Sequence, residues 1–158
     1  MIWLEALSYI VTILGLPTAV YVIWQEERRR RAHQEAELHR NLSAEYDAFL
    51  RLILENSDLL LFWPDGPQPE LTREQVERRD VVFRMLISLF EKAFIILYLE
   101  EMGADAARRW RSWEDDMREW CRREDFRAVL PEFLEGEDDE FSLYILALAR
   151  EEAPGDAA

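Results

Sequence analysis

The sequence predicts an all-α protein: a single N-terminal transmembrane helix, a charged stalk that continues it, and a cytoplasmic bundle of about four helices. Three observations predict this. An apolar run opens the chain, four arginines follow it directly, and apolar residues recur at helical spacing through the remainder. We expect an anchor over 1–24, a juxtamembrane stalk over 25–42, the bundle over 43–152 and a disordered tail over 153–158.

The anchor prediction depends on the length of the apolar run. From Ala6 to Trp24 the chain has 19 consecutive uncharged residues, which span roughly 28 Å as a helix, close to the hydrocarbon thickness of a bilayer. Trp3 and Trp24 bracket the run where aromatic residues anchor at membrane interfaces. A cleaved signal peptide is one alternative, but no Lys or Arg precedes the run. A buried core helix is another, although such a helix is rarely apolar on every face.

The charges beside the run predict its orientation. Arg28, Arg29, Arg30 and Arg31 follow it closely, and the positive-inside rule then places the N-terminus outside and the remainder in the cytoplasm. The four arginines are either a topology signal alone or a basic cluster that also contacts anionic lipid headgroups. Eighteen of the 19 basic residues are Arg, which is typical of a high-GC bacterial genome. We therefore predict a bacterial inner-membrane protein with the lipid bilayer as a partner.

Small and polar residues share one stripe of the predicted transmembrane helix. They recur at steps of three and four, so they lie on one face. Small residues let two helix backbones approach closely, which predicts a homo-oligomer that associates through this face. Pro17 lies off the stripe and is expected to kink the helix. The association face comprises Ser8, Thr12, Gly15 and Ala19, with Glu5 and Val22 at its ends.

A long helix is predicted after the Pro-rich stretch 64–69. Thr72-Arg73-Glu74-Gln75 has the form of a capping box, in which Thr72 and Gln75 satisfy each other's backbone N–H. From there we expect a helix to about Met102, with Gly103 as its C-terminal stop.

The centre of that helix, 81–99, is apolar almost all round, so a second membrane span is an alternative. Arg84, Glu91 and Lys92 interrupt it, and inserting three charges near mid-span would cost roughly 7–10 kcal/mol. The charges favour the central helix of a bundle. Glu91 is a candidate buried carboxylate that needs a partner, because a buried charge is costly unless it is paired. Arg84, seven residues earlier on nearly the same face, is the predicted partner, and an Arg of the next helix is the alternative.

Tryptophans mark the next predicted helix, Asp105–Arg123. Trp110, Trp113 and Trp120 fall on one stripe. Such a stripe is either the core face of the bundle or a surface for a protein partner, since Trp is common at binding hot spots. A short helix is expected after Asp125, another turn from Pro131, and a last helix over Phe141–Arg150.

The composition argues against several functions. Residues 124–158 hold eleven acids against Arg127 and Arg150, a net charge of −9, so we expect no nucleic-acid partner. His33 and His39 lie on different faces of the stalk, and no Glu-x-x-His pair suits a metal. The five glycines are isolated and form no phosphate-binding loop. The sequence thus predicts no cofactor, no metal site and no catalytic residue.

The order of features resembles a group of small uncharacterised bacterial membrane proteins known only as domains of unknown function. The resemblance rests on the N-terminal anchor, the stalk, the segment Phe49–Leu59, the apolar helix with its internal Glu, and Trp110-x-x-Trp113-Glu114. It implies bacterial origin and an inner-membrane location, and no activity. The sequence therefore predicts a self-associating, membrane-anchored helical adaptor or regulator. An oligomeric, channel-like effector built on the transmembrane helix, or an enzyme with an unrecognised site, is the alternative.

Overall fold

The computed structural model describes residues 21–27, 37–38, 40–62, 70–98 and 102–154. These residues form helices and connecting turns with no strand among them, so the all-α prediction is confirmed. The chain divides into two compact units, Met1–Asn41 and Leu42–Ala158. Residues 1–20 of the predicted anchor (1–24) and the arginine cluster 28–31 lie outside the described residues.

In the smaller unit, residues 21–27 are helical, and the side chains of Tyr21, Val22, Ile23 and Trp24 are exposed. No helix in the described part of the chain is long and apolar enough to cross a membrane.

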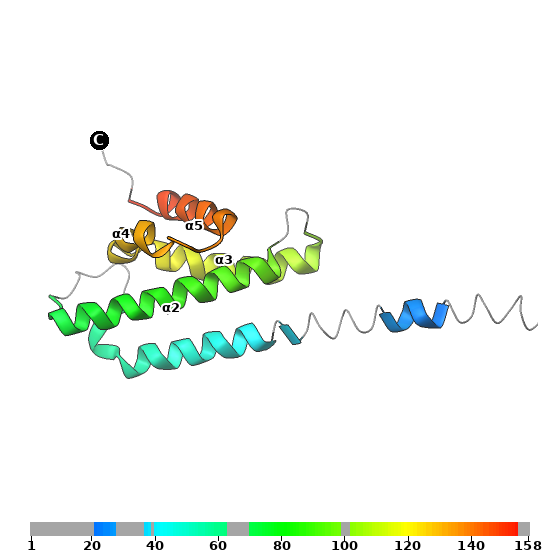
Figure 1. The fold of residues 1–158 in the computed structure, drawn as a ribbon, viewed down its shortest axis with the longest axis horizontal. Helices are drawn as coiled ribbons and strands as arrows, with labels where there is room; N and C mark the ends of the chain where they lie inside the picture. The colour runs from blue at the N-terminus through cyan, green and yellow to red at the C-terminus, as the bar shows by residue number, and fades with distance from the viewer. Residues whose placement is uncertain (1–20, 28–36, 39, 63–69, 99–101, 155–158) are drawn as a thin grey trace, which may run out of the picture. The chain divides into compact units, whose positions relative to one another are not determined.

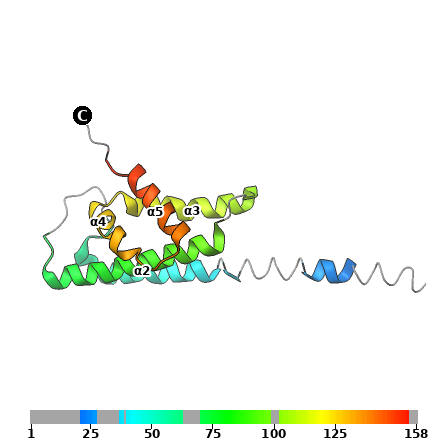
Figure 2. The ribbon, with the colours of Figure 1, turned by 45° about the horizontal axis from the view of Figure 1, so that its top comes forward.

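The larger unit is a helical bundle. Its first helix covers residues 40–55, of which those from 42 on belong to this unit, and the short 3₁₀ helix η1 follows at Ser57–Leu59. In Figures 1 and 2 helix 40–55 runs alongside α2 in the opposite direction. Both α4 and α5 pack against α2 and α3. The remaining elements are α2 (Arg73–Leu97), α3 (Ala104–Cys121), α4 (Glu124–Phe133) and α5 (Asp139–Glu151).

The capping box at the start of α2 is confirmed. The Thr72 hydroxyl accepts a hydrogen bond from the Gln75 N–H at 3.3 Å, and the Thr72 N–H donates to Gln75 Oε1 at 2.9 Å. The predicted end at Met102 is wrong, because α2 ends at Leu97. Tyr98 leaves the helix in an extended conformation, and its ring stacks on Phe94 with centroids 4.5 Å apart. Gly103 precedes α3 as its N-cap instead of ending α2.

A single helix, α4, passes through Pro131, where the sequence predicted a new turn. Pro131 lacks the N–H that would bond the Arg127 carbonyl, but Phe126, Leu130 and Phe133 continue one buried stripe across it. Burial of this stripe outweighs one lost hydrogen bond. The chain then turns at Gly136, whose φ of +97° suits glycine.

The tryptophan stripe of α3 faces the core. Trp110, Trp113 and Trp120 are buried, as are the aromatic rings of α2 and α4 that they meet. Phe83 contacts Trp120 and Phe126 edge-on, with centroids 6.2 Å and 5.2 Å away. These rings hold α2, α3 and α4 together, and both α2 and α3 contact every other labelled α-helix of the bundle.

Candidate functional site

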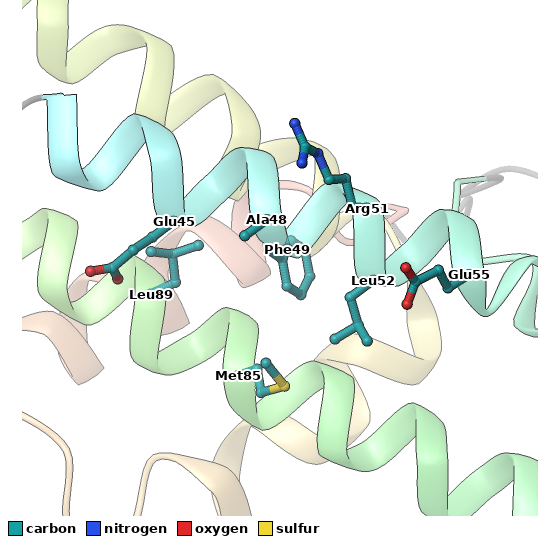
Figure 3. A pocket seen from close by; sticks show the side chains of 8 residues that line it. All are labelled: Glu45, Ala48, Phe49, Arg51, Leu52, Glu55, Met85 and Leu89. Atoms are coloured by element: carbon teal, nitrogen blue, oxygen red, sulfur yellow. The ribbon is translucent and has the colours of Figure 1, made fainter.

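A groove runs between helix 40–55 and α2. Its volume is about 460 Å³, and Figure 3 shows side chains from both helices projecting into it. The floor is apolar: Phe49 and Leu89 are buried, Leu52 is half-buried, and Met85 keeps 49 % of its surface exposed. The full lining is Glu45, Ala48, Phe49, Arg51, Leu52, Glu55, Met85 and Leu89.

Charged side chains surround this floor. Figure 3 shows Glu45 and Glu55 at opposite ends of the groove, and Arg51 pointing away from Met85. Glu45 forms an ion pair with Lys92 of α2 at 2.6 Å, which ties the two helices together at one end. Near the other end, Arg78 of α2 pairs with Asp58 at 2.6 Å. An apolar floor with a charged rim is the usual composition of a protein-binding surface.

The structure gives Glu91 a different partner from the predicted one. Glu91 is half-buried, and its Oε1 accepts a hydrogen bond from the backbone N–H of Asp138 at 2.6 Å. Arg84 instead pairs with Glu132 at 3.2 Å and lies over the Phe133 ring at 3.8 Å. Glu91 therefore fixes the turn that leads into α5, where Asp138 in turn accepts from the Phe141 N–H at 2.9 Å.

A second carboxyl group approaches Glu91. A hydrogen bond between Glu137 and Glu91 raises the pKa of Glu137, and burial and the charge of Glu91 act in the same direction. This pair joins α2 to the turn before α5.

Two tyrosines contact the tryptophans of α3. The Tyr46 ring lies 5.4 Å from that of Trp113, and the Tyr144 ring lies 5.7 Å from that of Trp110. Burial raises the pKa of Tyr46 and of Tyr144. These ring contacts connect α3 to helix 40–55 and to α5.

Burial also raises the pKa of Asp116 to about 6, and the charges of Glu119 and Asp115 add to this, while the hydrogen bond from Tyr46 opposes it. The folded protein therefore holds a proton on Asp116 more tightly than the unfolded chain does. The ionised carboxylate costs stability above pH 6, and this cost disappears as the pH falls toward the unfolded pKa.

We expect Asp116→Asn to stabilise the larger unit by about 1–3 kcal/mol at pH 8, because asparagine keeps an acceptor for Tyr46 without a buried charge. The advantage should disappear near pH 4, where Asp116 is protonated in the folded protein. Chemical unfolding of both proteins at pH 8 and pH 4 checks this. A gain that is equal at both pH values, or a loss at pH 8, would show that burial of the charge does not govern this site.

A buried arginine at the start of α4 was not predicted from the sequence. Arg123 is only 2 % exposed, and it donates to both carboxylate oxygens of Asp125, at 3.0 Å and 2.8 Å. It also donates to the carbonyls of Leu60 and Leu61, at 3.3 Å and 3.1 Å. Leu60 has a left-handed backbone with φ of +49°, which is unusual for a bulky residue. Arg123 thus holds the strained turn after η1 against α4.

Two other predicted sets, the transmembrane association face and the arginine cluster, lie outside the described residues, so their roles stay predictions. Among the described residues, no group of three or more His, Cys, Asp or Glu side chains could hold a metal ion. The one cysteine, Cys121, is buried, and burial raises the pKa of its thiol to about 12, so it is an inert core residue at neutral pH.

No family model, curated protein or solved structure matches the chain. The resemblance to uncharacterised bacterial membrane proteins therefore stays a prediction from the quoted residues.

Proposed function

We propose that this chain is a membrane-anchored helical adaptor that holds its bundle at the cytoplasmic face of the bacterial inner membrane. The observation that carries the proposal is the order of features along the sequence. The uncharged run Ala6–Trp24 comes first, the arginines 28–31 follow, and a separately folded helical unit begins at Leu42. A helix of that length and composition suits a bilayer, and its flanking arginines suit the cytoplasmic side.

The charge distribution supports this division of roles. The first 41 residues carry equal numbers of acidic and basic side chains, whereas residues 42–158 carry 28 acidic and 14 basic ones. Anionic lipid attracts the arginines and repels the acidic bundle. In this proposal the bundle stands clear of the membrane surface, where its groove is open to a partner.

Self-association through Ser8, Thr12, Gly15 and Ala19 is the second part of the proposal. A larger residue at the centre of that stripe would separate the helix backbones. We expect Gly15→Leu to reduce crosslinked oligomers in native membranes several-fold, while Leu16→Ile, off the stripe, leaves them unchanged. Crosslinking followed by mass spectrometry measures this and reports any protein partner in the same experiment.

The same stripe also suits the channel-like alternative, and a measurement of ion flux distinguishes that alternative from the adaptor. We expect no flux from the full-length chain in liposomes. Flux that is lost in Gly15→Leu would support the channel-like effector in place of the adaptor. If the oligomers persist in Gly15→Leu, association through this stripe is wrong.

A further inference from the structure

The groove between helix 40–55 and α2 has the dimensions of a helix-binding site. Glu45 and Glu55 are ten residues apart on one helix, so the groove is about 15 Å long, or three helical turns. Between them lie Ala48 and Leu52, and Met85 projects from the opposite wall (Figure 3). A trough between two neighbouring helices fits the apolar stripe of a third helix, with contacts at every third or fourth residue.

Charge decides which helix fits. The larger unit carries a net charge of −14, so a second copy of this chain is repelled at long range and a basic partner is attracted. One end of the groove repeats this preference locally. Glu55 has no ion-pair partner among the described residues, whereas Glu45 at the other end is already paired with Lys92 and Arg51 adds a positive charge to the lining.

We propose that the groove binds a basic amphipathic helix of a partner protein. Its apolar stripe covers Ala48, Leu52 and Met85, and a basic side chain at one end pairs with Glu55. This inference rests on the proposed adaptor function, because an adaptor needs a surface for its partner, and it adds the chemistry of that partner.

The test uses the full-length chain in nanodiscs of zwitterionic lipid. The probe is a fluorescein-labelled helical peptide of leucine and lysine, about 14 residues long, with leucines on one stripe and lysines on its flanks. Fluorescence anisotropy measures its affinity, and empty nanodiscs supply the lipid background. We expect saturable binding, and a scrambled peptide of the same composition should bind about tenfold more weakly because its leucines no longer form a stripe.

Matched variants test whether the peptide binds in the groove. Ala48→Gln with Met85→Gln makes the floor polar without changing charge, and both side chains are exposed enough to leave the fold intact. We expect this variant to lose about tenfold in affinity. Leu143→Gln on α5 changes an apolar side chain that is 72 % exposed and lies outside the groove, and it should bind like the unmodified chain.

Charge variants test the ends of the groove. Glu55→Gln should weaken binding about threefold or more, whereas Glu135→Gln, an exposed carboxylate outside the groove, should change it less than twofold. Equal binding by all variants, or by the scrambled peptide, would overturn the proposal in favour of general attraction to an acidic surface.

A second copy of the chain is the other occupant that the test can reveal. Disulfide-linked dimers of Met85→Cys that the peptide does not prevent would overturn the proposal in favour of self-association through the groove. The peptide-binding test and the test of the membrane anchor can succeed or fail independently of each other. If the chain proves not to be a membrane protein but the groove variants still lose the peptide, the anchor is wrong and the binding site stands.

Discussion

Arg123→Ala is expected to lower the free energy of unfolding of the larger unit by about 3–5 kcal/mol, the usual effect of removing one partner from a buried ion pair. The change removes the guanidinium that donates to both carboxylate oxygens of Asp125, itself only 11 % exposed, while Arg79 remains 3.8 Å from that carboxylate. It also removes the donors to the Leu60 and Leu61 carbonyls, so the strained turn at Leu60 loses its support. Thermal unfolding followed by circular dichroism should show a midpoint about 10 °C lower or more.

Arg109→Ala is the matched control, because Arg109 is an exposed arginine on α3. It should change stability by less than about 0.5 kcal/mol. Arg123→Lys should recover only part of the loss, since an ammonium group cannot reach both Asp125 oxygens in the planar geometry of a guanidinium. If Arg123→Ala is no less stable than Arg109→Ala, the network around Arg123 does not hold η1 against α4.

Phe94→Ala is expected to cost a similar amount, about 3–5 kcal/mol, through the cavity left by a large buried ring. Phe94 lies where three helices meet: its ring is 5.8 Å from Trp110 of α3, 5.8 Å from Phe141 and 5.3 Å from Tyr144 of α5, and 4.5 Å from Tyr98. Losing the ring should loosen α5 in particular, because two of these contacts lie on that helix. Hydrogen exchange of the α5 amides measures this effect directly.

The neighbouring residue supplies the control for this prediction. Ile95 lies on the same turn of α2 with 61 % of its surface exposed, so Ile95→Ala should cost less than about 0.5 kcal/mol. Equal losses for the two variants, or α5 amides that exchange no faster in Phe94→Ala, would contradict the packing described for this cluster.

Local signals in the sequence predicted the elements that depend on neighbouring residues. The capping box of Thr72 and Gln75 needs only four consecutive residues, and the spacing of the α3 tryptophans predicts that they share one stripe. Whether that stripe faces the core or a protein partner was left open by the sequence, and the structure shows the tryptophans buried. The end of α2 could not be predicted from the sequence, because Tyr98 leaves the helix to meet Trp110 and Tyr144, whose positions depend on how α3 and α5 pack.

The polar contacts of the interior were the least predictable part. Arginine is normally a surface residue. A buried Arg123 is favourable because it donates hydrogen bonds to the carbonyls of Leu60 and Leu61, which lie some sixty positions earlier in the chain. Glu91 was a candidate buried carboxylate from the sequence, and the structure shows it half-buried. Its partner, the Asp138 backbone N–H, carries no sequence signal, because every residue other than proline has that group.

The groove was not predicted for a similar reason. Leu52 and Met85 each belong to an ordinary amphipathic pattern on separate helices, 33 positions apart in the sequence. A site forms only when antiparallel packing places the two stripes side by side with a gap between them. The periodicity gives the buried face of each helix, but the space that neighbouring faces leave open depends on packing across the whole bundle.

Alkaline carbonate extraction of membranes that contain the full-length chain tests whether the N-terminal run crosses the bilayer, since it strips peripheral proteins and leaves those whose helices cross the bilayer. We expect the chain to sediment with the lipid and to enter solution only with detergent. A chain that stays in the supernatant, and remains monodisperse without detergent, would show that the apolar N-terminal run does not span a membrane.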